Sequence, residues 1–229
     1  MATPPEAVRR QLEVVTTTAA FDLQTLAAAA PLARRVDTLI AALPLIVPSY
    51  YDAAGSLALA WYDELRDESR PVTAYAPEVI GDPSTDWIER ETTIFRESLD
   101  SGDLARDMDA MLTQASLLAT KEVARGFRDS ITGNTRQDRD AIGWSRVARS
   151  GACKLCTMIA ARGAVFREST AHFAAHTSCH CTARPEFRNG DHGPEASVEQ
   201  YAASSKRRTP AQQKALRKYL NENYPDARG

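Results

Sequence analysis

The side chains best suited to chemistry gather in one short window of the C-terminal half. Residues 151–181, GACKLCTMIAARGAVFRESTAHFAAHTSCHC, hold all four cysteines of the chain and three of its four histidines. The other 198 residues hold one histidine and no cysteine. Thiolate and imidazole are preferred ligands of Zn²⁺ in proteins. This concentration therefore predicts a metal site.

The spacing of the cysteines allows two pairs to converge on one ion. Cys153 and Cys156 form a C-x-x-C turn, and Cys179 and Cys181 form a C-x-C in a run that we expect to be extended. Side chains two residues apart on a strand point to the same side. The 22 residues between the pairs leave room for a helix and a hairpin. We expect a closed, structural Zn²⁺ site drawn from Cys153, Cys156, His176, Cys179 and Cys181.

Three alternatives to this site stay open. His172, His176 and His180 lie four residues apart, so on a helix they would share one face as a metal-binding array, although the H-E-x-x-H pattern is absent. The cysteines could instead form disulfides, if the protein ends up outside a cell, for instance in a particle. They could also have no chemical role, which is less common for two such motifs in one window.

Length and composition limit the classes of protein to which the chain can belong. Its 229 residues are 43% hydrophobic and 25% charged, which suits one large domain or a body with a small appendage. The N-terminus lacks the apolar core of a signal peptide, and the most apolar run, residues 38–47, is too short to span a bilayer. These features predict a soluble, non-exported protein, in which paired cysteines are more often metal ligands than disulfides.

The net charge of −2 conceals an asymmetry along the chain. Residues 1–144 carry 14 Lys and Arg against 23 Asp and Glu, a net charge of −9, whereas residues 145–229 carry 14 against 7, a net charge of +7. The basic end could approach nucleic acid or an acidic protein surface, or the difference could reflect only solvated surface charge. Its candidate phosphate contacts are Arg146, Arg149, Lys154, Arg162, Arg184 and Arg188.

Helices are expected before the cysteine window. They are predicted over residues 5–43 with a break near Pro31, over residues 49–66 with Ser49 as N-cap, from Ser84 onward, and over residues 104–127. The second of these carries an apolar stripe of Tyr51, Ala54, Ala58, Trp61, Tyr62 and Leu65. The last carries Met108, Met111, Leu112, Ala115, Leu118 and Val123. Such stripes most often form a core.

A small α+β element and a basic tail are expected after the helices. A polar loop over residues 129–140 precedes a strand over 141–148, a helix over 154–162 ending at Gly163, a strand over 163–167 and an extended run over 179–185. Thr209 followed by Pro210 begins a terminal helix. The predicted fold is mainly α with a small α+β C-terminal element: a helical body over residues 1–130, a compact Cys/His subdomain over 131–190 and a basic tail over 191–229.

The cysteine motifs resemble those of the phage Mu F-like minor head proteins, also called head morphogenesis proteins. That family carries a C-x-x-C and, further along, an HP-x-CRC-like motif followed by a short strand. CKLC at residues 153–156 is similar to the first motif, and HTSCHC at residues 176–181 is similar to the second, with Thr177 in place of proline and His180 in place of arginine. The segment GWSRVARSGACKLCTMIAARGAVF also looks like the variant found in tailed phages and prophages of actinobacteria.

This resemblance implies a low-copy component of the virion or procapsid that acts near the portal during head assembly. It implies the portal, scaffold or major capsid protein as partners, and DNA is a candidate partner of the basic C-terminal part, with no membrane involved. The implied location is the virion, or the host cytoplasm during assembly. We expect a phage minor capsid protein that is structural rather than catalytic.

Two other functions stay open at this point. A capsid maturation protease, as some relatives next to the portal are labelled, would need a Ser-His or Ser-Lys pair made by folding, because neither G-x-S-x-G nor H-E-x-x-H is present. Its first histidines to test are His172 and His176, whereas His192 is expected to be merely exposed. A zinc-containing nucleic-acid-binding protein is the other function, and it predicts an affinity that falls steeply with salt.

Overall fold

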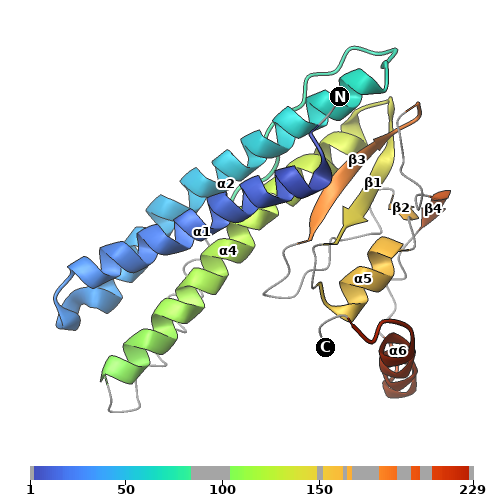
Figure 1. Cartoon of the computed structure of the whole chain (residues 1–229). Helices are drawn as coiled ribbons and strands as arrows, with labels where there is room; N and C mark the ends of the chain where they lie inside the picture. Colours follow the sequence, from blue (N-terminus) through green and yellow to red (C-terminus); the bar gives the residue numbers. More distant parts are fainter. Residues whose placement is uncertain are drawn as a thin grey trace.

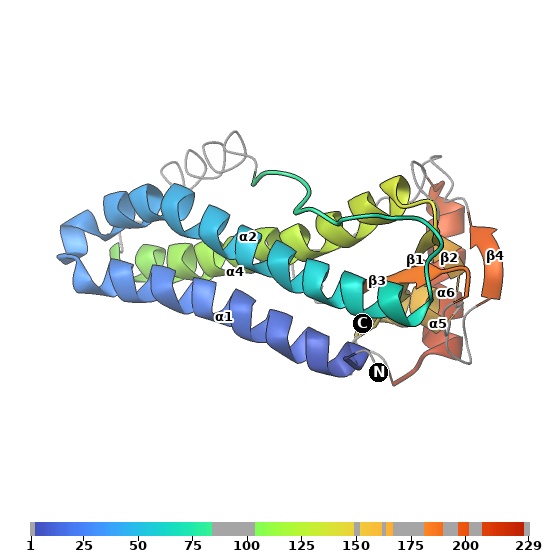
Figure 2. The ribbon, with the colours of Figure 1, turned by 90° about the horizontal axis from the view of Figure 1, so that it is seen from above.

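A computed structural model shows a long helical bundle with a small sheet at one end (Figures 1 and 2). It describes residues 3–83, 104–148, 152–161, 164–166, 181–189, 197–201 and 208–226. The helices are α1 Pro5–Ala29, the 3-10 helix η1 Leu32–Arg34, α2 Arg35–Glu68, α4 Leu104–Gln137, α5 Lys154–Ala161 and α6 Pro210–Asn223. The strands are β1 Ala141–Val147, β2 Ala164–Phe166, β3 Thr182–Phe187 and β4 Ser197–Tyr201. The predicted fold class, mainly α with a small α+β C-terminal element, is confirmed.

Helices α1 and α2 form a hairpin whose bend confirms the predicted break near Pro31. The predicted N-cap at Ser49 is wrong, because α2 continues through this position and the Ser49 hydroxyl donates to the carbonyl of Leu45 at 3.3 Å. Two prolines inside α2, Pro44 and Pro48, each remove a helical hydrogen bond. The helix persists because a buried apolar residue recurs every four positions across them, at Leu39, Leu43, Val47 and Tyr51.

Helix α4 corrects the predicted polar loop over residues 129–140. It continues from Leu104 to Gln137, ten residues beyond its predicted end. Its polar C-terminal residues stay helical because Ser130 and Asn134 are fully buried and hydrogen-bond a segment far away in sequence. The domain boundary expected after residue 130 falls inside this helix, and the division into three parts stays a prediction.

The sheet has the strand order β3-β1-β2-β4, with β1 antiparallel to both β2 and β3, and β2 parallel to β4. The strands expected from residues 141 and 163 and the helix expected from residue 154 are confirmed. Strand β3 continues past Pro185, which lies opposite Trp144. An edge strand tolerates proline because one side of it needs no ladder hydrogen bond. Strand β4 was not anticipated within the predicted tail.

The hydrophobic core joins the sheet to the bundle. One cluster combines Trp61, Tyr62 and Phe127 of the helices with Trp144 and Phe187 of the strands. The Tyr62 and Phe187 rings meet edge to face, with their centroids 5.2 Å apart. The apolar stripes predicted for α2 and α4 are confirmed as core, with Leu65 and Leu112 half-buried at its edge.

The remaining expectations concern the ends of the described ranges. Helix α6 begins as predicted, with Thr209 as N-cap and Pro210 in the first turn. The helix predicted from Ser84 lies outside the described residues. Within the described ranges, no helix combines the length and the apolar character that crossing a membrane requires.

Candidate metal centre

The first cysteine pair lies at the start of α5. Cys153 directly precedes this helix, and its carbonyl accepts hydrogen bonds from the backbone N–H of Thr157 at 2.9 Å and from the Thr157 hydroxyl at 3.1 Å. Cys156 lies in the first turn and is buried. The N-terminal end of a helix carries partial positive charge, which stabilises thiolates there. The local structure therefore suits two thiolate ligands.

The third described cysteine reaches this pair through the register of the sheet. Cys181 comes one residue before β3, and Thr182, the first residue of β3, lies opposite Val147, the last residue of β1. Ala148, the residue after β1, packs against the same small cluster as the cysteines, so the end of β1 brings the start of β3 beside the first pair. Buried Cys156 and Cys181 pack in one small cluster, and half-buried Cys153 packs against it. The fold thus gathers three of the five predicted ligands.

The other two candidate ligands, His176 and Cys179, lie outside the described residues, as do His172, His180 and His192. The histidine array and the histidines of a protease therefore stay predictions. Among the described residues, no three His, Cys, Asp or Glu side chains are arranged to hold a metal ion. A tetrahedral zinc site on the three described cysteines needs a fourth ligand, for which His176 and Cys179 are the candidates.

Arg146 lies in this centre, although the sequence did not predict a role for it there. It was named as a candidate phosphate contact, but its side chain is buried and its Nη1 donates to Sγ of Cys156 at 3.7 Å. A buried guanidinium beside sulfur favours the thiolate form and offsets the negative charge of a multi-thiolate site. The signal in the sequence is the strand period, because Arg146 lies two residues after the core residue Trp144.

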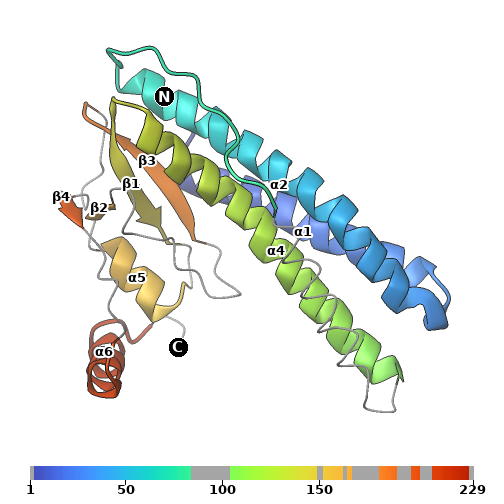
Figure 3. The same cartoon turned by 180° about the vertical axis from the view of Figure 1, so that it is seen from behind.

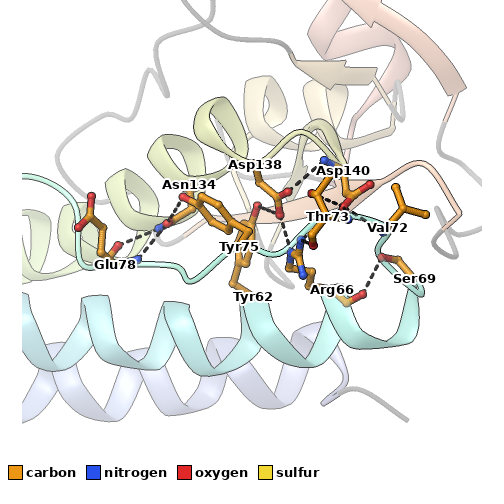
Figure 4. Close-up of polar contacts among 10 residues, drawn as sticks. All are labelled: Tyr62, Arg66, Ser69, Val72, Thr73, Tyr75, Glu78, Asn134, Asp138 and Asp140. Atoms are coloured by element: carbon orange, nitrogen blue, oxygen red, sulfur yellow. Dashed lines mark hydrogen bonds and ion pairs between the residues drawn. The ribbon is translucent and has the colours of Figure 1, made fainter.

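A second polar cluster lies where α2, α4 and the extended segment 70–83 meet (Figure 4). Arg66 Nε donates to Asp138 Oδ2 at 2.7 Å, and the two side chains are only 7% and 0% exposed. The Tyr62 hydroxyl donates to the same oxygen at 3.1 Å. Burial and the Asp138 carboxylate raise the pKa of Tyr62, which keeps its hydroxyl protonated as a donor.

The polar cluster continues to the backbone of the extended segment. Asp140 Oδ2 accepts hydrogen bonds from the Thr73 hydroxyl at 2.6 Å, from the Thr73 N–H at 2.8 Å and from the Val72 N–H at 3.2 Å. The bond from the Thr73 hydroxyl, followed by that from its N–H, holds the pKa of Asp140 below its usual value. Arg66 Nη2 also donates to the Thr73 carbonyl at 2.6 Å.

Farther along, the segment crosses α2 and α4, as Figure 3 shows. The Tyr75 hydroxyl donates to Asn134 Oδ1. At Ile80, the backbone N–H donates to the Ser130 hydroxyl, and the carbonyl accepts from the Tyr51 hydroxyl. The Asp138 and Asp140 carboxylates are thus already engaged by backbone and side-chain donors. This arrangement clamps the segment to the bundle, and it leaves the cysteine cluster as the better candidate for a ligand site.

Comparison with known proteins places the chain in a family. The model of the VG15 protein family matches residues 2–205. No curated protein and no solved structure matches the chain significantly. The match is to a viral family, which supports the phage origin that the cysteine motifs imply. It does not extend to the more specific assignment to the Mu F-like proteins. The chain belongs to the VG15 protein family and is a phage-related viral protein.

Proposed function

We propose that the chain is a phage minor capsid protein of the Mu F-like type, which acts structurally in head assembly near the portal. The observation that carries this proposal is the cluster in which half-buried Cys153 packs against buried Cys156 and Cys181. These positions belong to the two motifs on which the resemblance rests. With His176 or Cys179 as the fourth ligand the site would be closed and therefore structural, because a catalytic zinc keeps an open position.

A zinc ion in this cluster would join α5 to the start of β3. Cys156 and Cys181 are 25 residues apart in the sequence. A metal link between them would therefore hold the two ends of this part of the chain together. Structural zinc contributes on the order of 10 kcal/mol to the folding of such elements.

The helical bundle supplies a surface for partner proteins. Three large apolar side chains of α1 and α2 are mostly exposed: Val14 is 65%, Phe21 63% and Leu45 73% exposed. Exposed apolar side chains that share one face are candidates for protein contacts, and Val14 and Phe21, seven residues apart, share a face of α1. The partners we propose are the portal, scaffold or major capsid protein, met in the host cytoplasm during assembly and retained in the virion.

Isolation of heads tests this proposal. Tagged wild-type chain and a Cys153→Ser/Cys181→Ser variant are expressed during phage assembly, and procapsids and portal complexes are purified. We expect the wild type in these particles and a strong loss of the double variant. An Ala161→Ser variant, which adds a serine at the exposed end of α5, serves as the control and should be incorporated normally. A wild type that is absent from procapsids, heads and portal complexes contradicts the proposal.

The same material distinguishes a structural role from the protease alternative. Capsid and scaffold proteins are incubated with the purified wild-type chain and then sized by mass spectrometry. A structural role predicts that their lengths stay unchanged. Cleavage that is abolished by His172→Ala or His176→Ala would instead favour the maturation protease.

A further inference from the structure

Helix α6 lies beyond residues 2–205, so it is not covered by the family match. Its start is defined by a capping box. The backbone N–H of Gln212 donates to the Thr209 hydroxyl at 3.3 Å, and the N–H of Thr209 donates to Gln212 Oε1 at 2.9 Å. Pro210 follows the cap, where its fixed φ suits the first turn. The local sequence therefore specifies this helix strongly.

One side of α6 docks on the α+β element. Leu220 is buried and Leu216, four residues earlier, is half-buried. Lys154, the first residue of α5, donates from Nζ to Asn221 Oδ1 at 2.8 Å. Figures 1 and 3 show α6 beside α5, away from the bundle formed by α1, α2 and α4. Asn221 lies four residues after Arg217 and three after Lys218, so this hydrogen bond is made at the C-terminal end of the face that these two cations share.

One face of α6 carries exposed basic residues. Lys214, Arg217 and Lys218 follow a spacing of three and four residues, which places them together on one face. All three are exposed, and the Lys218 side chain is 76% exposed. Arg208, also exposed, lies just before the helix. The ion pair of Lys218 with Glu222 is long, at 3.8 Å, and both side chains are exposed, so salt screens it.

This face lacks what a protein partner would need. Protein interfaces depend on a few buried aromatic or apolar anchors at their centre. The three cations offer no such anchor: Leu220 is buried, Leu216 is half-buried, and Tyr219, 45% exposed beside Lys218, packs edge-on against the Tyr224 ring. A partner held by charge alone must itself carry a dense and regular negative charge. The phosphate backbone of nucleic acid has that property, with a charge for about every 1.7 Å of a duplex.

We propose that the basic face of α6, formed by Lys214, Arg217 and Lys218, binds the phosphate backbone of nucleic acid without reading its sequence. Arg146, a phosphate contact suggested by the sequence, is buried against Cys156 and cannot serve this surface. The proposal depends neither on a metal ion nor on incorporation into heads. If the function proposed above fails its test, the proposal for α6 is unaffected. If the proposal for α6 fails, the function proposed above is equally unaffected.

The test measures binding of the full chain to a fluorescein-labelled DNA duplex of random sequence by anisotropy, across a series of salt concentrations. We compare the wild type with Lys214→Gln/Arg217→Gln/Lys218→Gln. Glutamine keeps a helix propensity close to that of lysine and arginine, and circular dichroism checks that helix content is retained. We expect the logarithm of the wild-type affinity to fall linearly with the logarithm of the salt concentration. The slope should become shallower by about 3 in the variant, close to one unit for each lost contact.

A matched control removes the same charge elsewhere. Arg10→Gln/Arg34→Gln/Arg139→Gln changes three exposed residues of the bundle and its following turn and should keep the wild-type slope. Equal slopes for the α6 variant and the control would overturn the proposal, as would a wild type that does not bind DNA. Displacement of DNA by polyglutamate at equal charge concentration would also overturn it, because the face would then fit an acidic protein surface.

Discussion

Asn134 of α4 and the backbone of Glu78 hydrogen-bond each other in both directions. The N–H of Glu78 donates to Asn134 Oδ1 at 3.0 Å, and Asn134 Nδ2 donates to the Glu78 carbonyl at 2.8 Å. The Asn134 side chain thus gives the backbone of Glu78 one acceptor and one donor, as a neighbouring strand does in a sheet. Asn134 is fully buried, and its Oδ1 also accepts a hydrogen bond from the Tyr75 hydroxyl at 2.7 Å. One side chain therefore fixes the middle of the segment to α4.

Asn134→Ala should loosen this segment. The change removes these three hydrogen bonds and a fourth, from Asn134 Nδ2 to the Ser130 carbonyl at 2.6 Å. It leaves part-buried backbone groups without their partner, so we expect the unfolding free energy to fall by about 2 kcal/mol. Urea unfolding measures the loss, and hydrogen exchange at Glu78 measures the local opening. Gln137→Ala at the exposed end of α4 is the control and should change stability by less than about 0.5 kcal/mol. Equal effects of the two variants would show that the pairing is not stabilising.

Gly133→Ala tests how closely the segment packs on α4. A Cβ at position 133 would lie 2.6 Å from Cδ1 and 2.8 Å from Cγ2 of Ile80. On an exposed helix the change would stabilise by about 1 kcal/mol through helix propensity. Here we expect a net destabilisation of about 1–3 kcal/mol from overpacking. Thermal and urea unfolding report the sign.

The companion variant isolates the cause of this effect. In an Ile80→Ala background the crowding atoms Cδ1 and Cγ2 are absent, and Cβ at 3.1 Å is the close atom that remains. Gly133→Ala should then destabilise the protein much less than in the wild type, because helix propensity offsets the one remaining contact. A Gly133→Ala change that destabilises both backgrounds equally would mean that Ile80 is not the crowding side chain.

Local patterns in the sequence predicted most of the helices. The apolar stripe of α4 follows a period close to that of a helix, and the Thr209-Pro210 pair marks a helix start without help from the rest of the fold. The C-x-x-C and C-x-C spacing also led to the cluster that now holds Cys153, Cys156 and Cys181. These features depend on residues near one another in sequence.

The predictions that were wrong have one physical cause. Contacts with residues far away in the sequence gave these segments a different structure from the one that their local pattern predicts. Ser49 is a good N-cap by type, but burial of Val47 and Tyr51 on either side of Pro48 keeps the helix continuous. Residues 129–137 look like a loop because they are polar, yet Asn134 hydrogen-bonds Glu78, 56 residues earlier. Arg146 looks like a surface cation in the sequence, but in the fold it is buried and its guanidinium contacts Cys156 of α5. No single window of sequence contains both partners of these contacts.

Acid should weaken the attachment of the segment through Asp140. Hydrogen bonds from Thr73 hold the pKa of its carboxyl below the ordinary value of 3.8, so the folded state favours the carboxylate. The contribution to stability is therefore fully present above about pH 4 and is lost as the pH falls through the lower, folded pKa. Asp140→Asn should reduce the acid dependence of the unfolding free energy between pH 5 and pH 2.5, by about that one group.

Thr73→Val and Asp52→Asn complete this comparison. Thr73→Val removes the hydroxyl that lowers the pKa of Asp140 most and should reduce the acid dependence in part. Asp52→Asn changes an exposed carboxylate of α2 and should leave the dependence close to that of the wild type. An Asp140→Asn variant with the full wild-type dependence would place the responsible carboxyl elsewhere.

The cysteine cluster predicts a zinc-dependent element around α5 and β3. Protein purified without chelator should contain about one zinc per chain. Chelation, or Cys153→Ser/Cys181→Ser, should remove the metal and make the C-terminal part sensitive to protease. Arg146→Met removes the guanidinium that donates to Cys156 Sγ at 3.7 Å. We expect it to lower zinc affinity by about 10–100-fold, as the loss of a partner to a metal ligand commonly does.

Two measurements separate the contribution of the Arg146 guanidinium from that of the zinc ion. Zinc affinity by competition with a chromophoric chelator should fall for Arg146→Met and stay unchanged for Arg139→Met, which changes an exposed arginine on the turn before β1. Protease resistance of zinc-loaded Arg146→Met should return at high zinc concentration, because mass action restores a site that is weakened but intact. Metal-free wild type with unchanged protease resistance would show instead that the three described cysteines form only a packed cluster, held by burial and by Arg146 without an ion.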